Sequence, residues 1–282
     1  MVIKWNELLE ELIDEIDFKT SIERNGFYNS NVSLQIFGEK YGFKPKNTAS
    51  HLSINFWSEQ SQVLKKHDMY ILRTGYGGFC IFDKNKFPSP YLQLNTSNVE
   101  NLDLEIDYEF KELMSAFDTK QENPGLEHLN ACGGYDVLIK KLFGNLKWKL
   151  GPRGGQDSKF KVFGKTSQNE IIPVFNYYGS EELDYSIWTK EHILLFEAKA
   201  VKPNQGLDVG WHKFAYPASR FRKFKNHSIV PIYLLKWGMV THLFVFPTFR
   251  FHNDEGIIIN DLEQLKPERS FRIDFGTPLE KF

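Results

Sequence analysis

The stretch LDYSIWTKEHILLFEAKA, residues 183–200, decides the fold of the second half of the chain. Two apolar runs flank a short polar sequence, a pattern that is typical of a β-hairpin. A tight turn centred on Lys190 and Glu191 would place Asp184 directly opposite Glu197, with their Cβ atoms about 5 Å apart. Lys199 follows Glu197 by two residues and faces the same side of the strand. The hairpin therefore predicts that two carboxylates and one ammonium group converge.

Glu197 and Lys199 end an apolar strand, where charged groups are costly unless they are paired or take part in chemistry. Asp184 and Glu197 would repel each other at this distance unless a cation lies between them. Carboxylate oxygens suit Mg²⁺, which keeps several of its waters and binds phosphate oxygens. We therefore expect Asp184 and Glu197 to be metal ligands and Lys199 to be a catalytic positive charge beside an attacking water. A surface salt bridge is the structural alternative.

Asp184 followed by Glu197-Ala198-Lys199 resembles the PD-(D/E)XK nuclease superfamily, which includes most Type II restriction endonucleases. The resemblance covers roughly residues 121–250, with Leu183 where the name of the motif has proline. It implies a Mg²⁺-dependent endonuclease that hydrolyses phosphodiester bonds of double-stranded DNA at a specific sequence, acting as a homodimer. It also implies a further catalytic glutamate from the first core helix, and Glu127 is the best match.

The other elements of the second half predict an α/β fold in which a mixed, restriction-endonuclease-like sheet is flanked by helices. Asn123 followed by Pro124 is a typical helix start. A second helical segment spans 209–224, and Pro217 must bend or split it. The glycines of 151–160 predict a loop. Apolar runs predict strands at 160–165, 170–178, 183–188, 193–200, 229–237 and 242–251.

The first half resembles winged helix-turn-helix DNA-binding domains in the order of its elements. Helical patterns over 5–17, over 32–41 and from about Asn47 precede an apolar hairpin over 69–83, whose glycine-rich turn would be the wing. We expect a winged-helix-like DNA-reading domain with an acidic linker over 1–118, and a nuclease domain over 119–282. A small α/β domain used for dimerisation or packing is the alternative.

The predicted DNA contacts come from three places in the chain. The third helix would enter the major groove, the wing would lie by the DNA backbone, and basic stretches at 140–161 and 202–227 flank the predicted metal site in sequence. The residues singled out are Ser50, His51, Asn55, Arg73, Tyr76, Arg153, Lys159, Lys202 and Lys213.

Composition narrows the setting and leaves other functions open. Only two cysteines are present, without metal-type spacing, and the acidic N-terminal stretch does not read as a signal peptide. Because a disulfide framework is not indicated, a reducing cytoplasm is the expected compartment, and no apolar stretch is long enough to span a membrane. The alternatives to a restriction enzyme are a non-catalytic winged-helix DNA-binding regulator, and a junction-resolvase or repair nuclease.

Overall fold

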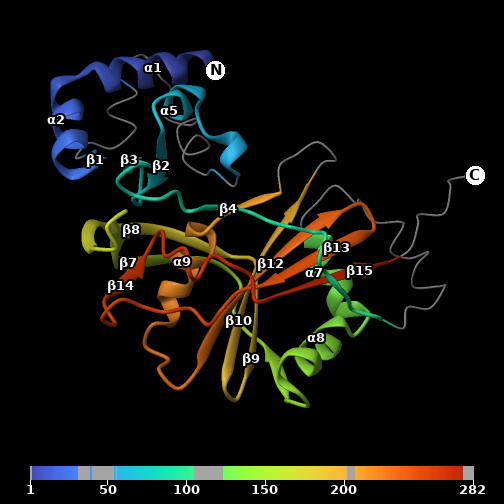
Figure 1. Ribbon diagram of the computed structural model, residues 1–282. Helices are drawn as coiled ribbons and strands as arrows, with labels where there is room; N and C mark the ends of the chain where they lie inside the picture. Colours follow the sequence, from blue (N-terminus) through green and yellow to red (C-terminus); the bar gives the residue numbers. More distant parts are fainter. Residues whose placement is uncertain are drawn as a thin grey trace, which may run out of the picture.

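The structure is a computed structural model of the chain. It describes residues 2–30, 39, 54, 56–104, 123–201 and 207–275. Helices and several sheets are combined in one mixed α/β fold, so the predicted fold class is confirmed at this level (Figure 1). No helix in these ranges is both long and apolar enough to span a membrane.

The large sheet of the second half is mixed, with strand order β5-β15-β13-β12-β10-β9-β6. Its centre is a parallel pair, β10 and β12, and each continues into antiparallel neighbours. Buried residues run almost without interruption along both central strands, as expected for strands covered on two faces. The bounds are β6 Trp148–Leu150, β9 Tyr185–Thr189, β10 His192–Ala200, β12 Ser228–Trp237, β13 Val240–Val245 and β15 Arg269–Asp274.

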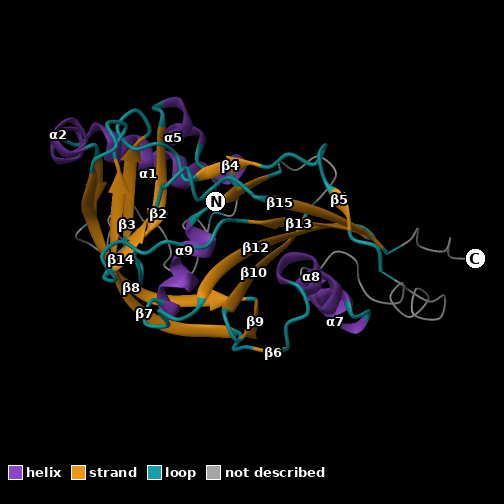
Figure 2. Ribbon diagram, turned by 60° about the horizontal axis from the view of Figure 1, so that its bottom comes forward, coloured by secondary structure: helices purple, strands orange, loops and turns teal. Residues whose placement is uncertain are grey.

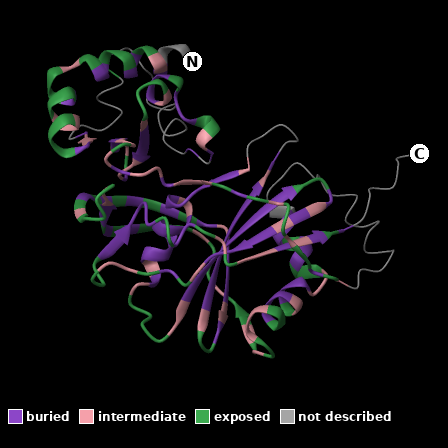
Figure 3. Cartoon of the chain, viewed as in Figure 1, coloured by how far each residue is buried: buried purple, intermediate pink, exposed green. Residues whose placement is uncertain are grey.

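Helices cover the two faces of this sheet (Figure 2). One face packs against α7, Asn123–Ala131, and α8, Gly134–Phe143, through a core that includes Leu129, Tyr135 and Phe196. The other face packs against α9, His212–Ala218, whose Phe214 and Ala215 lie in a second core with Leu195. Figure 3 shows how strongly the buried residues concentrate in the strands between these layers.

A long antiparallel hairpin leads into the large sheet. It consists of β7, Gly154–Lys165, and β8, Ile171–Leu183, with β14, Gly256–Ile258, added to the outer edge of β7. Burial alternates along the second part of β8, so one face packs inward and the other is exposed. Asp184 alone separates the end of β8 from the start of β9 in the large sheet. A nearly continuous stretch of strand therefore passes from one sheet to the other at Asp184.

Two local predictions for the second half are corrected. The predicted glycine-rich loop at 151–160 is mostly strand, because Gly154 to Phe160 pair residue by residue with β8. The predicted helix at 209–224 begins instead as a strand, β11, Asp208–Gly210, and α9 gives way after Ala218 to the 3-10 turn η3, Ser219–Phe221. Pro217 stands in the last turn of α9, where the break was expected.

The N-terminal part contains helices and a small sheet. α1, Val2–Asp14, and α2, Ile16–Asn25, replace the single helix predicted over 5–17. The sheet has the order β1-β3-β2, with β1 at Phe27–Asn29, and the predicted hairpin is confirmed as β2, Met69–Arg73, and β3, Phe79–Asp83. Ahead of β2 in the chain lie η2, Trp57–Glu59, and α5, Gln62–Lys66. The predicted helices at 32–41 and from Asn47 fall almost wholly outside the described residues, so the winged helix stays a prediction.

Two short strands from the first half pair with the second half. β4, Tyr91–Gln93, runs antiparallel to β11, and β5, Glu100–Asn101, runs parallel to β15. One hydrophobic core also joins Tyr70 and Phe82 of the N-terminal hairpin to Phe160 and Phe214 of the second half. Residues ahead of the predicted boundary at 118 are thus built into the layers that follow it. Most of the predicted acidic linker lies outside the described residues.

Candidate active site

The predicted hairpin register is confirmed. β9 pairs with β10 so that Tyr185 lies opposite Phe196 and Trp188 opposite Ile193. Asp184 is the next residue in this register and would face Glu197, but the ladder stops one pair earlier. In place of that pair, the carboxylate Oδ2 of Asp184 accepts a hydrogen bond from the backbone N–H of Ala198 at 2.8 Å. This bond holds the partly exposed carboxylate of Asp184 next to the backbone of β10, between Glu197 and Lys199.

Glu197 and Lys199 lie on the α9 face of β10, because the alternate residues Phe196 and Ala198 face the α7–α8 core. Both charged residues are buried, with 7% and 8% of their surface exposed. Lys199 Nζ lies 3.1 Å from Glu197 Oε1 and donates to the carbonyl oxygen of Ala198 at 2.8 Å. The contact between Lys199 and Glu197 is compatible with a salt bridge and with a catalytic role. The prediction that such a salt bridge would lie on the surface is wrong, because both residues are buried.

The electrostatic setting of Glu197 favours an additional cation. Burial raises the pKa of Glu197 to about 7, although the positive charges of Lys199 and Lys213 lower it. The nearby carboxylate of Asp184 adds to the rise. A buried carboxylate next to a second carboxylate is stabilised in its charged form by any cation placed between them. The neighbouring carboxyl groups of Asp184 and Glu197 are thus suited to a cation.

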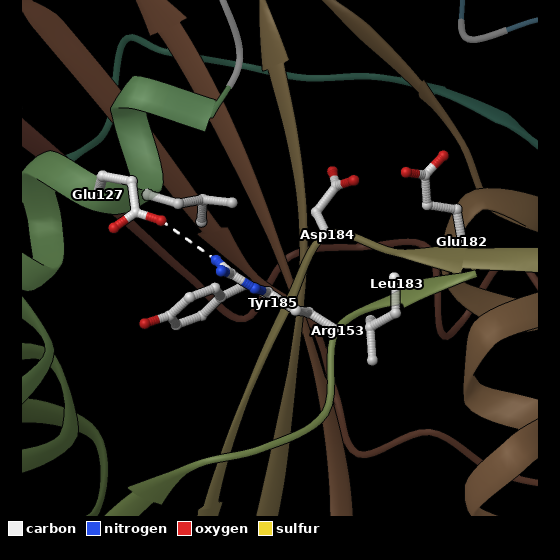
Figure 4. A pocket seen from close by; sticks show the side chains of 8 residues that line it. Glu127, Arg153, Glu182, Leu183, Asp184 and Tyr185 are labelled. Carbon is white, nitrogen blue, oxygen red and sulfur yellow. Dashed lines mark hydrogen bonds and ion pairs between the residues drawn. The ribbon is translucent and has the colours of Figure 1, made fainter. Parts of the chain in front are cut away.

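A pocket of about 410 Å³ opens beside Asp184. Figure 4 shows Asp184 and Glu182 pointing to the same side of the strand, while Glu127 reaches in from α7. Arg153 lies between them, and its Nη1 is 3.3 Å from Glu127 Oε1. The predicted catalytic Glu127 therefore shares a pocket with Asp184, but in this arrangement it pairs with an arginine. Glu197 and Lys199 do not line the pocket, whose walls are formed by Leu126, Glu127, Arg153, Gly154, Glu182, Leu183, Asp184 and Tyr185.

The donors at this site fit a hard cation that retains water. Within the described residues, no group of three or more His, Cys, Asp and Glu side chains is arranged to hold a metal ion. Asp184 and Glu197 would supply two carboxylates, and the exposed side of Asp184 leaves room for water and for phosphate oxygens. Mg²⁺ is commonly bound in this way, by one or two carboxylates together with water and substrate phosphate.

The predicted DNA contacts are distributed over several locations. Ser50, His51, Asn55 and Lys202 lie outside the described residues. Lys159 is exposed on β7, and the half-buried Lys213 lies on α9, close enough to Glu197 to lower its pKa, which burial raises. Lys213 thus lies near enough to the candidate active site to act on Glu197, which its sequence neighbours did not indicate.

The predicted wing is in contact with the second half of the chain. Tyr76 is 56% exposed, and its hydroxyl is hydrogen-bonded to the carboxylate of Asp157 on β7. Arg73 is turned toward β8, where its Nη2 donates to the buried carboxylate of Glu181 at 3.1 Å. Glu181 and Glu182 are acidic residues near the site that were missed. The alternation of β8 would have placed Glu182 on the face of Asp184, whereas nothing local in the sequence signals Glu181.

Comparison with known protein families, curated proteins and solved structures finds no match to the chain. Asp184, Glu197 and Lys199 are therefore interpreted from their geometry and chemistry.

Proposed function

We propose that the chain is a Mg²⁺-dependent endodeoxyribonuclease that cuts double-stranded DNA at a specific sequence, as a Type II restriction enzyme does. The observation that carries this proposal is the meeting of Asp184, Glu197 and Lys199 where β8 passes into β9. Two carboxylates and an ammonium group are gathered beside a largely apolar sheet, and burying two of them, Glu197 and Lys199, is costly. A role in the hydrolysis of a phosphodiester bond would explain why these charged groups are kept there despite the cost.

Each of the three residues has a distinct part in the proposed reaction. Asp184 and Glu197 would hold the metal, and the N–H of Ala198 keeps the Asp184 carboxylate in place. When bound, Mg²⁺ supplies polarisation of the phosphate and a lower pKa for a bound water. The ammonium of Lys199, held by Glu197 and the Ala198 carbonyl, would orient the attacking water and offset the charge that develops on the phosphate.

The same proposal includes a DNA-reading domain, a homodimer and a cytoplasmic location. A DNA-reading helix from about Asn47 would present Ser50, His51 and Asn55 to base edges, while Lys159 and Lys202 would lie near phosphates. A homodimer would match a palindromic site. The cytoplasm is the proposed compartment, consistent with Cys80 and Cys132 both being free thiols.

Digestion of a mixed-sequence plasmid tests the reaction. In Mg²⁺ we expect a fixed set of fragments, and in EDTA the plasmid should stay intact, with cleavage restored by excess Mg²⁺. Tight, sequence-selective binding without cleavage in any divalent cation would favour the non-catalytic regulator. Cleavage of branched DNA alone would favour the junction resolvase.

Arg153 should contribute to DNA affinity without contributing to sequence choice. Its ion pair with Glu127 joins two well-exposed side chains, so Arg153→Ala should have little effect on stability. We expect weaker binding to specific and random DNA alike, and a salt dependence reduced by about one counterion. His51→Ala should instead weaken specific binding more than random binding. Fluorescence anisotropy across a salt series measures both effects.

Lys190→Ala is the matched control for Arg153→Ala, because Lys190 is an exposed cation at the far end of the β9–β10 hairpin. The two variants should differ clearly in affinity. An Arg153→Ala protein that discriminates less between specific and random DNA would contradict a backbone role and assign Arg153 to base recognition.

A further inference from the structure

The turn between β2 and β3 is docked on β8 by main-chain contacts. Tyr76 N donates to Tyr178 O at 2.9 Å, and Tyr178 N donates to Thr74 O at 3.3 Å. Gly75 lies between these bonds with a φ of 134°, and a Cβ at this position would lie 1.9 Å from Tyr178 O. Only glycine permits such a close approach. The N-terminal hairpin and β8 are therefore fitted to each other at this point.

Arg73, at the end of β2, reinforces the same contact with its side chain. Its Nη2 donates to Tyr177 Oη at 2.7 Å, to Ser180 O at 2.7 Å and to Glu181 Oε1 at 3.1 Å. The side chain of Glu181 is only 6% exposed, so Arg73 neutralises a charge that water cannot reach well. From α9, Tyr216 Oη donates to the carbonyl oxygen of Arg73 at 2.9 Å. Arg73 thus joins the N-terminal hairpin, β8 and α9.

These contacts lie next to the candidate active site. Glu181 precedes Asp184 by three residues on the strand that passes between the two sheets. Burial raises the pKa of Glu181 to about 7, and the positive charges of Arg73, Arg220 and Lys213 oppose this rise. Lys213 also acts on Glu197. Glu181, paired with Arg73, and Glu197, paired with Lys199, are therefore both within the electrostatic influence of Lys213.

We propose that Arg73 is a positioning residue, which holds β8 and Glu181 so that Asp184 and Lys213 take up the arrangement that DNA cleavage needs. The N-terminal part of the chain then completes the active site in addition to reading DNA. This inference rests on the proposed nuclease function.

The physical reason lies in what the loss of Arg73 leaves behind. Glu181 would keep a buried charge without its nearest counterion, a costly state that is relieved by protonation or by a closer approach to Lys213. Movement of Lys213 toward Glu181 would weaken the electrostatic stabilisation that Lys213 gives to the carboxylate of Glu197. Loss of the bond to Ser180 O would also free the strand just ahead of Asp184. Both changes alter the site without removing any group from it.

The test compares Arg73→Gln, the double variant Arg73→Gln/Glu181→Gln, and Arg272→Gln as the matched control. Arg272 is also a partly exposed arginine in an ion pair, with Asp274 at 2.7 Å, but it lies on β15. Single-turnover cleavage in Mg²⁺, DNA binding in Ca²⁺ and hydrogen exchange at the Ala198 amide are measured, with melting temperature as the folding check. The Ala198 amide reports on Asp184 directly, because it donates to that carboxylate.

We expect Arg73→Gln to slow cleavage about 10- to 100-fold, the usual effect of losing a group that orients a ligand. DNA binding should change less than about twofold, and the Ala198 amide should exchange faster. The double variant should cleave faster than Arg73→Gln, because it removes the uncompensated charge. Arg272→Gln should match the wild type. If Arg73→Gln fails to fold, Arg73→Lys keeps the charge but loses the planar fork, and should show the same changes more weakly.

Arg73→Gln with normal cleavage and unchanged exchange at Ala198 would overturn the inference. Equal slowing by Arg73→Gln and Arg272→Gln would also overturn it, since the effect would then be a general loss of stability. A wild-type protein that cleaves no DNA would end the nuclease proposal alone. Faster exchange at Ala198 in Arg73→Gln, but not in Arg272→Gln, would still support the positioning role in that case.

Discussion

Glu197→Gln should abolish DNA cleavage, with a loss of about 10³-fold or more, while DNA binding in Ca²⁺ stays within a few-fold of the wild type. Removing one positioned electrostatic group commonly costs about 10²–10³ in rate, and this change also removes a metal ligand. The amide keeps the size of the side chain and can still accept from Lys199 Nζ, now 3.1 Å from Glu197 Oε1. The packing of β10 should therefore survive.

Asp184→Asn should behave in the same way, because Asn can still accept the hydrogen bond from Ala198 N. Glu191→Gln is the control, since Glu191 is an exposed glutamate at the turn of the same hairpin. Rates come from single-turnover cleavage of a labelled duplex. Full activity in either Glu197→Gln or Asp184→Asn would remove these residues from the active site and leave the buried ion pair as a structural feature.

Lys199→Ala should slow cleavage by about 10² or more without preventing metal binding. The ammonium is buried and held by two oxygen atoms, so its position is fixed relative to both carboxylates. Lys199→Arg should not restore the rate, because a planar guanidinium does not reproduce a compact point charge. Single-turnover rates at saturating Mg²⁺ separate a slower chemical step from weaker metal binding.

Stability must be measured alongside the Lys199 variants. Breaking a buried ion pair commonly costs about 3–5 kcal/mol, so Lys199→Ala should also lower the melting temperature. Lys190→Ala, from the exposed turn of the hairpin, should change neither property. Near-normal turnover in a destabilised Lys199→Ala protein would assign the lysine to structure and not to catalysis.

The central hairpin could be predicted because its signals are local. Polar residues from Thr189 to His192 separate two apolar runs, and the turn sets the register that brings Asp184 toward Glu197. The passage of β8 into β9 between two different sheets was not predictable. Burial alternates along β8 through Leu183, whereas β9 is buried at nearly every position after Asp184. The residues on either side of Asp184 do not indicate that the partner strand changes there. The loop predicted from the glycines at 154–155 was wrong for a similar reason, since pairing with β8 overrides the preference of glycine for turns.

The surroundings of the site depend on contacts that are distant in sequence. Arg73 and Glu181 are separated by 108 residues, and neither stands in a motif that indicates the other. Lys213 was predicted as a DNA contact from its basic neighbours, although the fold of α9 brings it toward Glu197. The alternation of side chains along a strand predicted that Glu197 and Lys199 share a face. It could not predict which distant residues pack against that face.

If the proposed function holds, the pairing of β4 with β11 and of β5 with β15 has a consequence for how the protein could acquire a new sequence specificity. Recombination that exchanges everything ahead of residue 118 would replace the strands that pair with β11 and β15, together with the N-terminal residues of a shared core. Exchange is therefore compatible with folding only where the incoming segment preserves these pairings. Changes of recognition are expected to accumulate by substitution within the N-terminal module more readily than by shuffling of whole modules.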